Sequence, residues 1–456
     1  MEVILQRIFK ELIFWLAWIV IPLLWEVTPA VVGFFILIFK NFSNKKVAIP
    51  IKFPEITIII PIFNSENTLF SCLQSIYNSD YPQNMITIML VDNGSKDNSY
   101  NIFIEFQQKY TDISLWWMSS KQGKSKALNL ALFNSKGKYI INLDSDGKIE
   151  KSALKNMVNK FEQDTNIECM TGTVLIDPVL VDATKDFFLR LTRRCEMYEY
   201  FQAFLAGRNY ESVSNSIYTL SGAFSAFRKS SILKSMMYNS ITVCEDTHIT
   251  FQLRCILNVD INLCEDALFF VDPIEAYDKL YTQRQRWQRG EIEVSHMFLT
   301  KRLKAIKGFF TDFMVRILMY DHTFAFPRAI WYFAIIYLFF KNYPFKLIIG
   351  SFIFLYLLYV LVAFLFYICV SLYLKKFKEL RKQYMSHWYI CFILPLFSFV
   401  VFWIRFASII NSIKTDTKWK TLTFTEEVKK FTDQLKSDFR KVGVLKKKIE
   451  RMFNNE

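Results

Sequence analysis

The feature that most constrains this chain is the position of its longest apolar runs, which lie toward the two ends of the sequence. They are Leu12–Phe39, Ala325–Phe340, Leu347–Leu374 and Trp388–Ile410. The hydrocarbon core of a bilayer needs about 20 apolar residues of helix, so these runs are candidate spans or in-plane helices. The sequence between Ile56 and about Thr300 is mixed in character. We therefore expect a soluble domain held between membrane anchors, which also accounts for the positive mean hydropathy of the chain.

The first apolar run has the character of a retained anchor. It carries Pro22, Glu26 and Pro29 and has no small-residue cleavage site before Lys40, so it is not a cleavable signal peptide. The two prolines could split it into a short re-entrant piece and a span. The side of the membrane on which the N-terminus lies stays open.

Basic residues flank the apolar runs and suggest an orientation. They follow the first run at Lys40, Lys45, Lys46 and Lys52, and the third run within residues 375–382. The positive-inside rule then places the soluble domain in the cytoplasm. The Lys-rich tail is expected there too, although a full span over Trp388–Ile410 would send it outside. Pro395 favours a broken or in-plane helix, which would remove that conflict.

Two further features relate to the membrane. Residues 301–320 space their charges against Phe309, Phe310 and other apolar residues, which predicts an amphipathic helix lying in the membrane surface. Arg328 and Arg405 lie within apolar runs. They could line a transmembrane path or extend to the interface.

The formal charge of +14 raises the question of a nucleic-acid partner. No zinc-finger, RNP-like or helix-turn-helix pattern accompanies the charge, so we predict no nucleic acid and assign the basic residues to contact with anionic lipid. Eight cysteines occur without a CxxC pair, and four histidines are scattered. This pattern predicts neither a disulfide framework nor a zinc site, in keeping with a reducing cytoplasm.

The soluble middle alternates between strand and helix patterns. The β-branched run Ile56–Pro61 predicts a strand, and Leu69, Leu73 and Ile76 recur after it at helical spacing. The next unit begins with a buried strand that ends at Asp92.

The pattern continues with two helices and a strand. Asn98 or Ser99 is the expected N-cap of a helix, residues 124–137 form another helix with Gly137 as its C-cap, and residues 138–143 form a strand. Alternating strands and helices imply parallel pairing with right-handed crossovers. The predicted fold is therefore α/β, with a Rossmann-like half sheet.

Carboxylates follow two of these strands. Asp92 ends one, and Asp144 and Asp146, then Gly147, end the strand at 138–143. Ligands of such sheets gather beyond the carboxyl ends of the strands, and one or two carboxylates with substrate phosphates are a usual Mg²⁺ site. The alternative is a turn in which Asp144 and Asp146 only cap backbone groups.

Four blocks of sequence, in order, resemble a known family. They are PIFNSE with VDNGSKD, LDSDG, SGAFSAFRKS with CEDTHIT, and QRQRW. They resemble glycosyltransferase family 2, in particular its membrane-embedded processive branch, which includes cellulose, hyaluronan, chitin and poly-N-acetylglucosamine synthases. The length and tail pattern favour the poly-N-acetylglucosamine-synthase-like or exosortase-associated members.

The resemblance implies a division of the chain. An N-terminal membrane anchor is expected over residues 1–50, and a cytoplasmic nucleotide-diphospho-sugar transferase domain over 51–300. Interfacial and transmembrane helices are expected over 301–412, with a basic cytoplasmic tail over 413–456.

The resemblance also implies contacts to the nucleotide. Asp92 corresponds to the acid that contacts the uracil and ribose, with Asn64 and Glu66 beside it on the loop after the first strand. Many members carry this acid one place later, where this chain has Asn93. Lys124 lies at a helix start, where it could hold phosphate, unless it is an ordinary surface lysine.

For the metal and the base, the resemblance implies carboxylates from distant parts of the chain. Asp146 is the expected main ligand of Mg²⁺ or Mn²⁺, with Asp144 beside it facing the sugar or ribose. Asp246 corresponds to the general base and Glu245 is its neighbour. The alternative is that Glu245 and Asp246 only stabilise the start of a helix through its dipole, which would not exclude catalysis. His248 is a weaker alternative base, since it lies one turn into that helix.

The remaining blocks concern the acceptor and the diphosphate. Ser221 and Gly222 belong to the segment that the resemblance implies will cup the terminal acceptor sugar. Gln283, Arg286 and Trp287 form the Q-x-x-R-W pattern of polymer synthases. Arg286 would bind diphosphate and Trp287 would form a floor for the acceptor. The alternative is an interfacial basic helix with a belt tryptophan.

The resemblance thus implies an inverting, multi-pass glycosyltransferase of the bacterial inner membrane. Its expected partners are a nucleotide-sugar donor, expected to be a UDP-sugar, a growing polysaccharide or lipid acceptor and membrane lipids, with an accessory subunit as a further possibility. Two alternatives stay open: transfer of a single sugar to a membrane lipid, and an inactive transferase-like scaffold.

Overall fold

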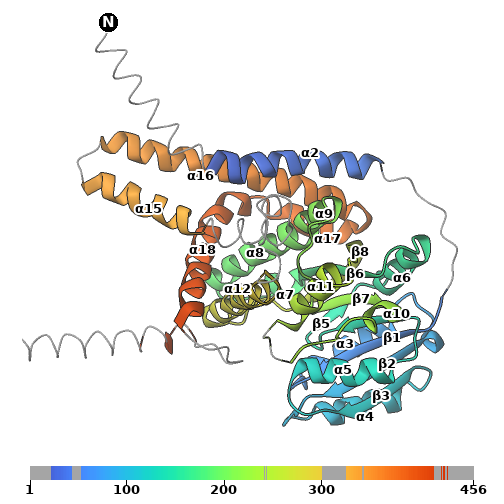
Figure 1. The fold of residues 1–456 in the computed structure, drawn as a ribbon. Helices are drawn as coiled ribbons and strands as arrows, with labels where there is room; N and C mark the ends of the chain where they lie inside the picture. Colours follow the sequence, from blue (N-terminus) through green and yellow to red (C-terminus); the bar gives the residue numbers. More distant parts are fainter. Residues whose placement is uncertain are drawn as a thin grey trace, which may run out of the picture.

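The protein is seen in a computed structural model that describes residues 22–43, 53–240, 242, 244–299, 325–340, 344–414 and a few positions from 423 to 429. An α/β domain and a group of long helices make up these residues (Figure 1). The predicted surface helix at 301–320 and almost all of the tail at 413–456 lie outside the described residues.

One mixed eight-stranded sheet forms the centre of the α/β domain, in the order β3-β2-β1-β4-β7-β6-β8-β5. Its strands are β1 (Ile56–Ile62), β2 (Ile86–Asp92), β3 (Ser114–Ser119), β4 (Tyr139–Leu143), β5 (Gly147–Ile149), β6 (Cys169–Ile176), β7 (Phe224–Arg228) and β8 (Ile261–Val271). Strands β3, β2, β1 and β4 are parallel, whereas β7 is antiparallel to both β4 and β6. The predicted parallel half sheet is therefore confirmed, and its continuation is mixed.

Helices cover both faces of the sheet (Figure 1). They are α3 (Leu69–Tyr77), α4 (Ser99–Lys109), α5 (Lys124–Asn134), α6 (Ala153–Gln163), α7 (Pro178–Asp182), α8 (Phe187–Tyr200), the π-helix η3 (Phe201–Gly207), α9 (Arg208–Val213), α10 (Lys229–Ile232), α11 (Glu245–Cys255) and α12 (Tyr277–Leu299), with the short 3-10 helix η2 (Gln83–Met85). Along β1, Ile58 and Ile60 belong to the core that includes residues of α3, α4 and α6, while Ile59 belongs to the core with α5 and α11. This alternation follows from the two-residue period of a strand.

The end of α5 differs from the prediction. The helix ends at Asn134, with Ser135 as its C-cap, so Gly137 does not cap it. Gly137 instead lies against β1, where its N–H donates to Thr57 Oγ1 at 3.0 Å. A Cβ on Gly137 would lie 2.5 Å from the backbone nitrogen of Thr57, so close packing against the strand requires glycine here.

The long helices correspond to the predicted apolar runs. They are α2 (Thr28–Ser43), α15 (Ala325–Phe340), α16 (Phe345–Tyr373) and α18 (Ile390–Lys414). Shorter elements accompany them: the π-helix η1 (Leu23–Val27), η5 (Leu374–Lys376) and the polar helix α17 (Lys378–Ser386). Within the described residues, two helical segments, Phe345–Lys376 and Ile390–Asn411, are long and apolar enough to cross a membrane. The other two predicted runs hold the shorter helices α2 and α15, of 16 residues each, and residues 12–21 of the first run lie outside the described part.

Two expected breaks at proline are not found. Pro395 lies inside α18, which continues as one helix to Lys414. Pro29 directly follows the π-helical turn η1, and the helix continues through it to Ser43. The last run is therefore not broken at Pro395 and the first is not divided at Pro29, while an in-plane orientation of α18 stays a prediction.

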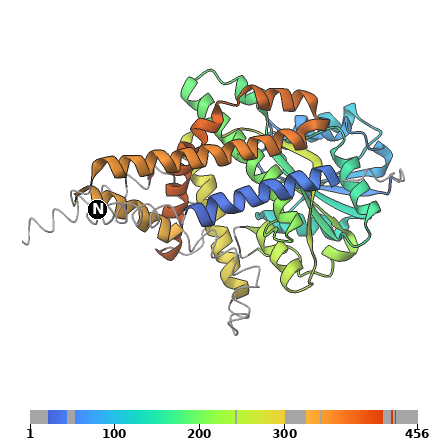
Figure 2. The ribbon, with the colours of Figure 1, turned by 90° about the horizontal axis from the view of Figure 1, so that it is seen from above.

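The helical group is packed against the α/β domain. Helices α2 and α16 run side by side (Figures 1 and 2), and Tyr373 Oη donates to the carbonyl oxygen of Leu37 at 3.3 Å. Helix α18 packs against α12, where Ser408 Oγ donates to the carbonyl oxygen of Gln285 at 2.9 Å. The two candidate spans therefore connect directly to the elements around the site described next.

Candidate active site

A cavity of about 340 Å³ lies at the carboxyl edge of the sheet. Strand β7 is antiparallel to β4, so its first residue, Phe224, pairs with Leu143, the last residue of β4. The loops after β4 and before β7 consequently meet at one edge, joined by the N–H of Asp144 donating to the carbonyl of Ala223 at 3.1 Å. Ten of the residues proposed from the sequence line this cavity: Lys124, Asp144, Asp146, Ser221, Gly222, Glu245, Asp246, Gln283, Arg286 and Trp287.

Lys124 joins two of the acidic segments. Its Nζ lies 2.7 Å from Asp144 Oδ1 and 3.3 Å from Glu245 Oε1. Burial opposes its charge, but Asp144 and Glu245 outweigh burial and raise the pKa of Lys124. The start of its helix is fixed by Asn93, whose Oδ1 accepts from the N–H of Gly123 at 2.5 Å. Lys124 is thus a fixed cation between two carboxylates rather than a free surface lysine.

Asp146 lies exposed in the cavity at the end of the segment that follows β4. Partial loss of water, and next the charge of Asp144, raise the pKa of Asp146 to about 6. The segment is anchored by Ser145, whose Oγ is 2.7 Å from Ser65 Oγ. Gly147 is required directly afterwards, because a Cβ there would lie 2.3 Å from the Phe269 ring. The chain turns at this glycine into β5, which leaves Asp146 facing the cavity.

Asp246 lies in the first turn of α11 and is held by backbone donors. Its Oδ2 accepts from the N–H of Gly222 at 3.1 Å and its Oδ1 from the N–H of Thr247 at 2.7 Å. Burial, followed by the charge of Glu245, raises the pKa of Asp246 to about 6. A carboxylate with this pKa is suited to accept a proton near neutral pH.

Helix α12 brings Gln283, Arg286 and Trp287 to the cavity. Gln283 Nε2 donates to Tyr200 Oη at 3.3 Å, and the guanidinium of Arg284 lies 4.5 Å from the centroid of the Trp287 ring. Arg284 also pairs with Glu199 at 2.5 Å, so the cation that backs Trp287 is itself held in place.

A glycine on α12 lets that helix approach the start of α11. A Cβ on Gly290 would lie 2.0 Å from Cys244 Sγ, and Cys244 is the residue before Glu245. The close approach of α12 to the start of α11 therefore requires glycine at position 290.

Three proposed residues lie at the same sheet edge but do not line this cavity: Asn64, Glu66 and Asp92. Asn64 Oδ1 accepts from the N–H of Lys96 at 2.9 Å, and Glu66 Oε2 from the N–H of Asn98 at 3.0 Å. These bonds tie the loop after β1 to the loop after β2. Asp92 Oδ1 accepts from the N–H of Ser95 at 2.9 Å, within the second of these loops.

Several lining residues were not proposed from the sequence: Tyr200, Phe204, Arg208, Tyr218, Asp272 and Glu291. The signal for Asp272 was present, since it directly follows the buried strand β8, as Asp144 follows β4. The aromatic residues carried no spacing pattern that separates them from core residues. Arg405 lines the cavity, while the side chain of Arg328 lies outside the described part.

The alternative base, His248, is placed away from the cavity lining. Its Nδ1 is 2.9 Å from Gln252 Nε2 and its ring packs edge-on against Phe298. Burial lowers the pKa of His248, which keeps it neutral. These contacts indicate a core histidine.

The residues present fit a divalent cation held jointly with a diphosphate. Within the described residues, no group of three or more His, Cys, Asp or Glu side chains forms a complete protein metal site. Asp146 offers an exposed carboxylate whose neighbours Asp144 and Asp272 are also acidic. Mg²⁺ is commonly bound by one or two carboxylates with substrate phosphates supplying the other oxygens, and this donor set agrees with that pattern.

The fold of this chain is one that solved α/β glycosyltransferases also have. The chain shares its fold with a mannosyltransferase from Pyrobaculum calidifontis, solved in complex with GDP-Man and Mn²⁺, at a TM-score of 0.57 and 16% identity over 86% of this chain and 97% of that one. Residues 57–234 match the family model of glycosyl transferase family 2. Over these residues the chain is similar to the family 2 glycosyltransferases.

The chain is also similar to curated relatives over part of their length. A poly-beta-1,6-N-acetyl-D-glucosamine synthase of Staphylococcus epidermidis is 25% identical over 52% of this chain and 55% of its own length. A synthase of the same name from Staphylococcus aureus is 23% identical over 57% of this chain and 61% of its own length. The matches therefore span little more than half the length of these relatives.

Proposed function

We propose that this protein is an inverting glycosyltransferase, which takes a nucleotide sugar and extends a β-linked polysaccharide. One observation carries the proposal: Asp146, Asp246 and the Arg286–Trp287 pair, from three separate parts of the chain, line one cavity. Relatives named as polysaccharide synthases support a polymer product. Their name also makes UDP-N-acetylglucosamine the first donor to test.

The proposed reaction is a single displacement. An acceptor hydroxyl attacks the anomeric carbon of the donor sugar while the bond from that carbon to the diphosphate oxygen breaks. Asp246 takes the hydroxyl proton, and the nucleoside diphosphate leaves with the bonding electron pair. Attack from the face opposite the leaving group inverts the anomeric centre, so an α-linked donor gives a β-linked product.

The other lining residues have assigned roles in this proposal. Arg286 offers a fixed fork of donors to the diphosphate, and Lys124 contributes positive charge beside it. Trp287 presents an aromatic face on which an acceptor sugar can stack. Gly222 holds the carboxylate of Asp246 through its N–H. Asn64, Glu66 and Asp92 would contact the nucleobase and ribose at the outer end of the site. Ser221 and Gln283 would line the acceptor side. Glu245 would raise the pKa of Asp246 through its charge.

A divalent cation, Mg²⁺ or Mn²⁺, is part of the proposal. Asp146 would hold it, with Asp144 beside it, and when bound it would neutralise charge on the departing diphosphate. The Mn²⁺ in the solved mannosyltransferase complex supports divalent metal use by this fold.

We further propose that the enzyme is bound to the bacterial inner membrane with its α/β domain in the cytoplasm. The two apolar helices α16 and α18 support membrane attachment, and the basic residues after α2 and α16 support the orientation. Because α18 contacts α12, the acceptor side of the cavity would open toward these helices.

The test uses membranes that carry the full chain, supplied with labelled UDP-N-acetylglucosamine, UDP-glucose or GDP-mannose and with Mg²⁺ or Mn²⁺. We expect polymer and released UDP with one UDP-sugar, and neither from the Asp246→Asn variant. If no donor releases nucleotide, the transferase proposal is wrong and an inactive scaffold is favoured.

A second candidate is transfer of one sugar to a membrane lipid. It is favoured by an apolar cavity of about 740 Å³ between α2, α16 and α18, whose lining includes Pro29, Gly33, Phe352 and Phe399. A lipid chain could occupy such a cavity. Product size separates the two candidates: a single labelled, organic-soluble product supports this one, and a ladder of long products supports polymer synthesis.

A further inference from the structure

The segment from Ser216 to Ala223, between α9 and β7, has no regular secondary structure, yet it forms much of one cavity wall. It includes Ser221 and Gly222, and Gly222 holds the carboxylate of Asp246. Since no helix or sheet hydrogen bonds fix the part of this segment before Gly222, its position depends on side chains from neighbouring elements.

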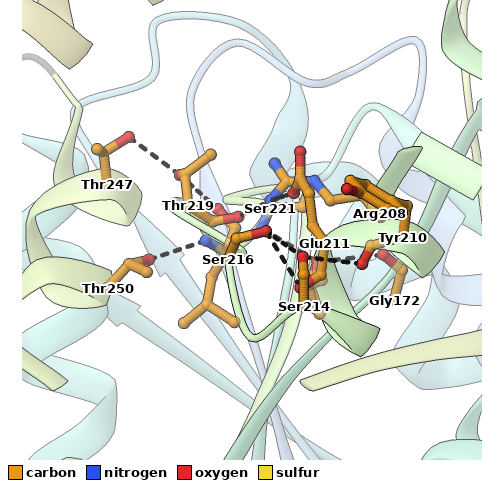
Figure 3. A network of polar contacts seen from close by, with 12 residues as sticks. Gly172, Arg208, Tyr210, Glu211, Ser214, Ser216, Thr219, Ser221, Thr247 and Thr250 are labelled. Atoms are coloured by element: carbon orange, nitrogen blue, oxygen red, sulfur yellow. Dashed lines mark hydrogen bonds and ion pairs between the residues drawn. The ribbon is translucent and has the colours of Figure 1, made fainter. Parts of the chain in front are cut away.

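Threonines of α11 hold the segment from one side. Thr250 is fully buried, and its Oγ1 accepts from the N–H of Leu220 at 2.8 Å. The same hydroxyl donates to the carbonyl oxygen of Asp246 at 2.6 Å. Thr247 adds a second contact, with its Oγ1 3.0 Å from Thr219 Oγ1 (Figure 3).

Other elements hold the segment from the opposite side. Arg208, at the start of α9, donates to the carbonyl oxygen of Thr219 (Figure 3). Thr171 of β6 accepts from the N–H of Ser221 at 3.1 Å. The segment is therefore fixed between β6, α9 and α11.

These bonds form a closed circuit around the proposed base. The carboxylate of Asp246 accepts a hydrogen bond from the N–H of Gly222. Two residues before Gly222, the N–H of Leu220 donates to the Thr250 hydroxyl. That hydroxyl donates in turn to the carbonyl oxygen of Asp246. Glycine is also needed at position 222, because a Cβ there would lie 2.9 Å from Asp246 Oδ2. The hydroxyl of Thr250 both accepts and donates a hydrogen bond in this circuit.

We propose that Thr250 is a positioning residue for glycosyl transfer, which fixes the wall segment so that Gly222 orients Asp246. This inference rests on the proposed function of Asp246 as the base. Thr250 does not line the cavity and touches no substrate in this account. Its loss should thus misplace the base without removing any donor contact, and misplacement by about 1 Å can cost on the order of a hundredfold in rate.

The test compares Thr250→Val with Thr250→Ser in the full chain. Valine keeps the shape but removes both hydrogen bonds, so we expect kcat to fall by about ten- to a hundredfold while the KM for the donor and the Kd for UDP stay within about threefold. Serine keeps the hydroxyl, so kcat should return to within about threefold of the parent value. Amide exchange of Leu220 should be faster in the valine variant only.

Thr57→Val is the matched control. Thr57 is another fully buried threonine that accepts from a backbone N–H, that of Gly137, but it lies near the start of β1, at the far end of the strand from the site. We expect it to lower Tm without changing kcat. The proposal is wrong if Thr250→Val keeps the parent kcat, or if the serine variant loses as much rate as the valine variant. Absence of transfer by the parent chain with every donor would instead reject the proposed function as a whole.

Discussion

Two acidic regions at the same sheet edge differ in how their carboxylates are bonded. In the loops after β1 and β2, Asp97 accepts from the N–H of Glu66 at 2.8 Å and from Ser99 Oγ at 2.7 Å. Burial pushes the pKa of Asp97 up, but these hydrogen bonds outweigh burial and lower it. In the cavity, the pKa of Asp146 and that of Asp246 are both raised, to about 6.

Hydrogen bonds lower the pKa of Asp97, whereas at Asp246 burial and the charge of Glu245 outweigh the bonds from Gly222 and Thr247 and raise the pKa. Hydrogen bonds from the backbone stabilise the ionised form and lower a pKa, whereas loss of water and a neighbouring negative charge raise it. Asp97 and Asp146 both lie in loops that follow strands, so position in the sequence does not distinguish them. Their partners do.

The largest effect is expected for Asp246→Asn. Removing the base should lower transfer by about a hundredfold or more, because general base catalysis commonly supplies that much. The Kd for UDP should stay within about threefold, since Asp246 is assigned to the acceptor. Labelled transfer and calorimetry measure the two quantities. Transfer at the parent rate would show that the base is elsewhere.

Asp146→Ala should weaken donor binding, and only when metal is present. With Mn²⁺ we expect the Kd for UDP to rise by about tenfold, because a carboxylate ligand of the cation is lost; in EDTA the variant and the parent should bind alike. Titration calorimetry under both conditions measures this. An equal loss of affinity with and without metal would remove Asp146 from the metal site.

Gly222→Ala tests the wall of the cavity. The new Cβ would lie 2.9 Å from Asp246 Oδ2, so the carboxylate must move, and we expect kcat to fall by about tenfold. Gly33→Ala is the control, because its Cβ would lie at an ordinary 3.4 Å from the Tyr210 ring. Steady-state kinetics on both variants measure the difference, and equal rates would contradict the assigned contact.

The raised pKa of Asp246 predicts a pH dependence. Asp246 must be ionised to accept a proton, so at saturating Mn²⁺ the value of kcat/KM should rise as pH increases through about 6. Glu245→Gln removes a neighbouring charge that raises this pKa, so the acid limb should move to lower pH. A pH–rate profile of both proteins checks the sign. Movement to higher pH would contradict it.

Asp97→Asn should give the smallest change in activity. The loop carboxylate supports the fold, so we expect a loss of about 1–2 kcal/mol in stability from weakened hydrogen bonds and a kcat within about twofold of the parent. Thermal unfolding and the transfer assay measure both. A large loss of kcat at unchanged Tm would place this loop in the catalytic machinery.

The sequence predicted the parallel half sheet well, because buried β-branched strands and amphipathic helices such as Leu69–Tyr77 have clear periods. It could not predict the antiparallel strand β7, whose five residues follow an irregular segment. It also misread Gly137, since a glycine required by packing against a strand looks like a helix C-cap in one dimension.

For the site, motif resemblance identified the residues with distinctive local sequences, such as Asp246 and Trp287. It could not identify Tyr200 or Arg208, which reach the cavity only through the packing of α8, η3 and α9. Nor could it show that Asn64 and Glu66 bond to the neighbouring loop, because those contacts join residues about 30 positions apart.

The most direct test of the central claim is an experimental structure of the full chain with UDP and Mn²⁺. We expect the diphosphate between Asp146 and Arg286, with Mn²⁺ at Asp146 and the Asp246 carboxylate facing the same cavity. Nucleotide bound elsewhere, or diphosphate bound with Asp246 directed away from it, would show that this cavity is not the transfer site.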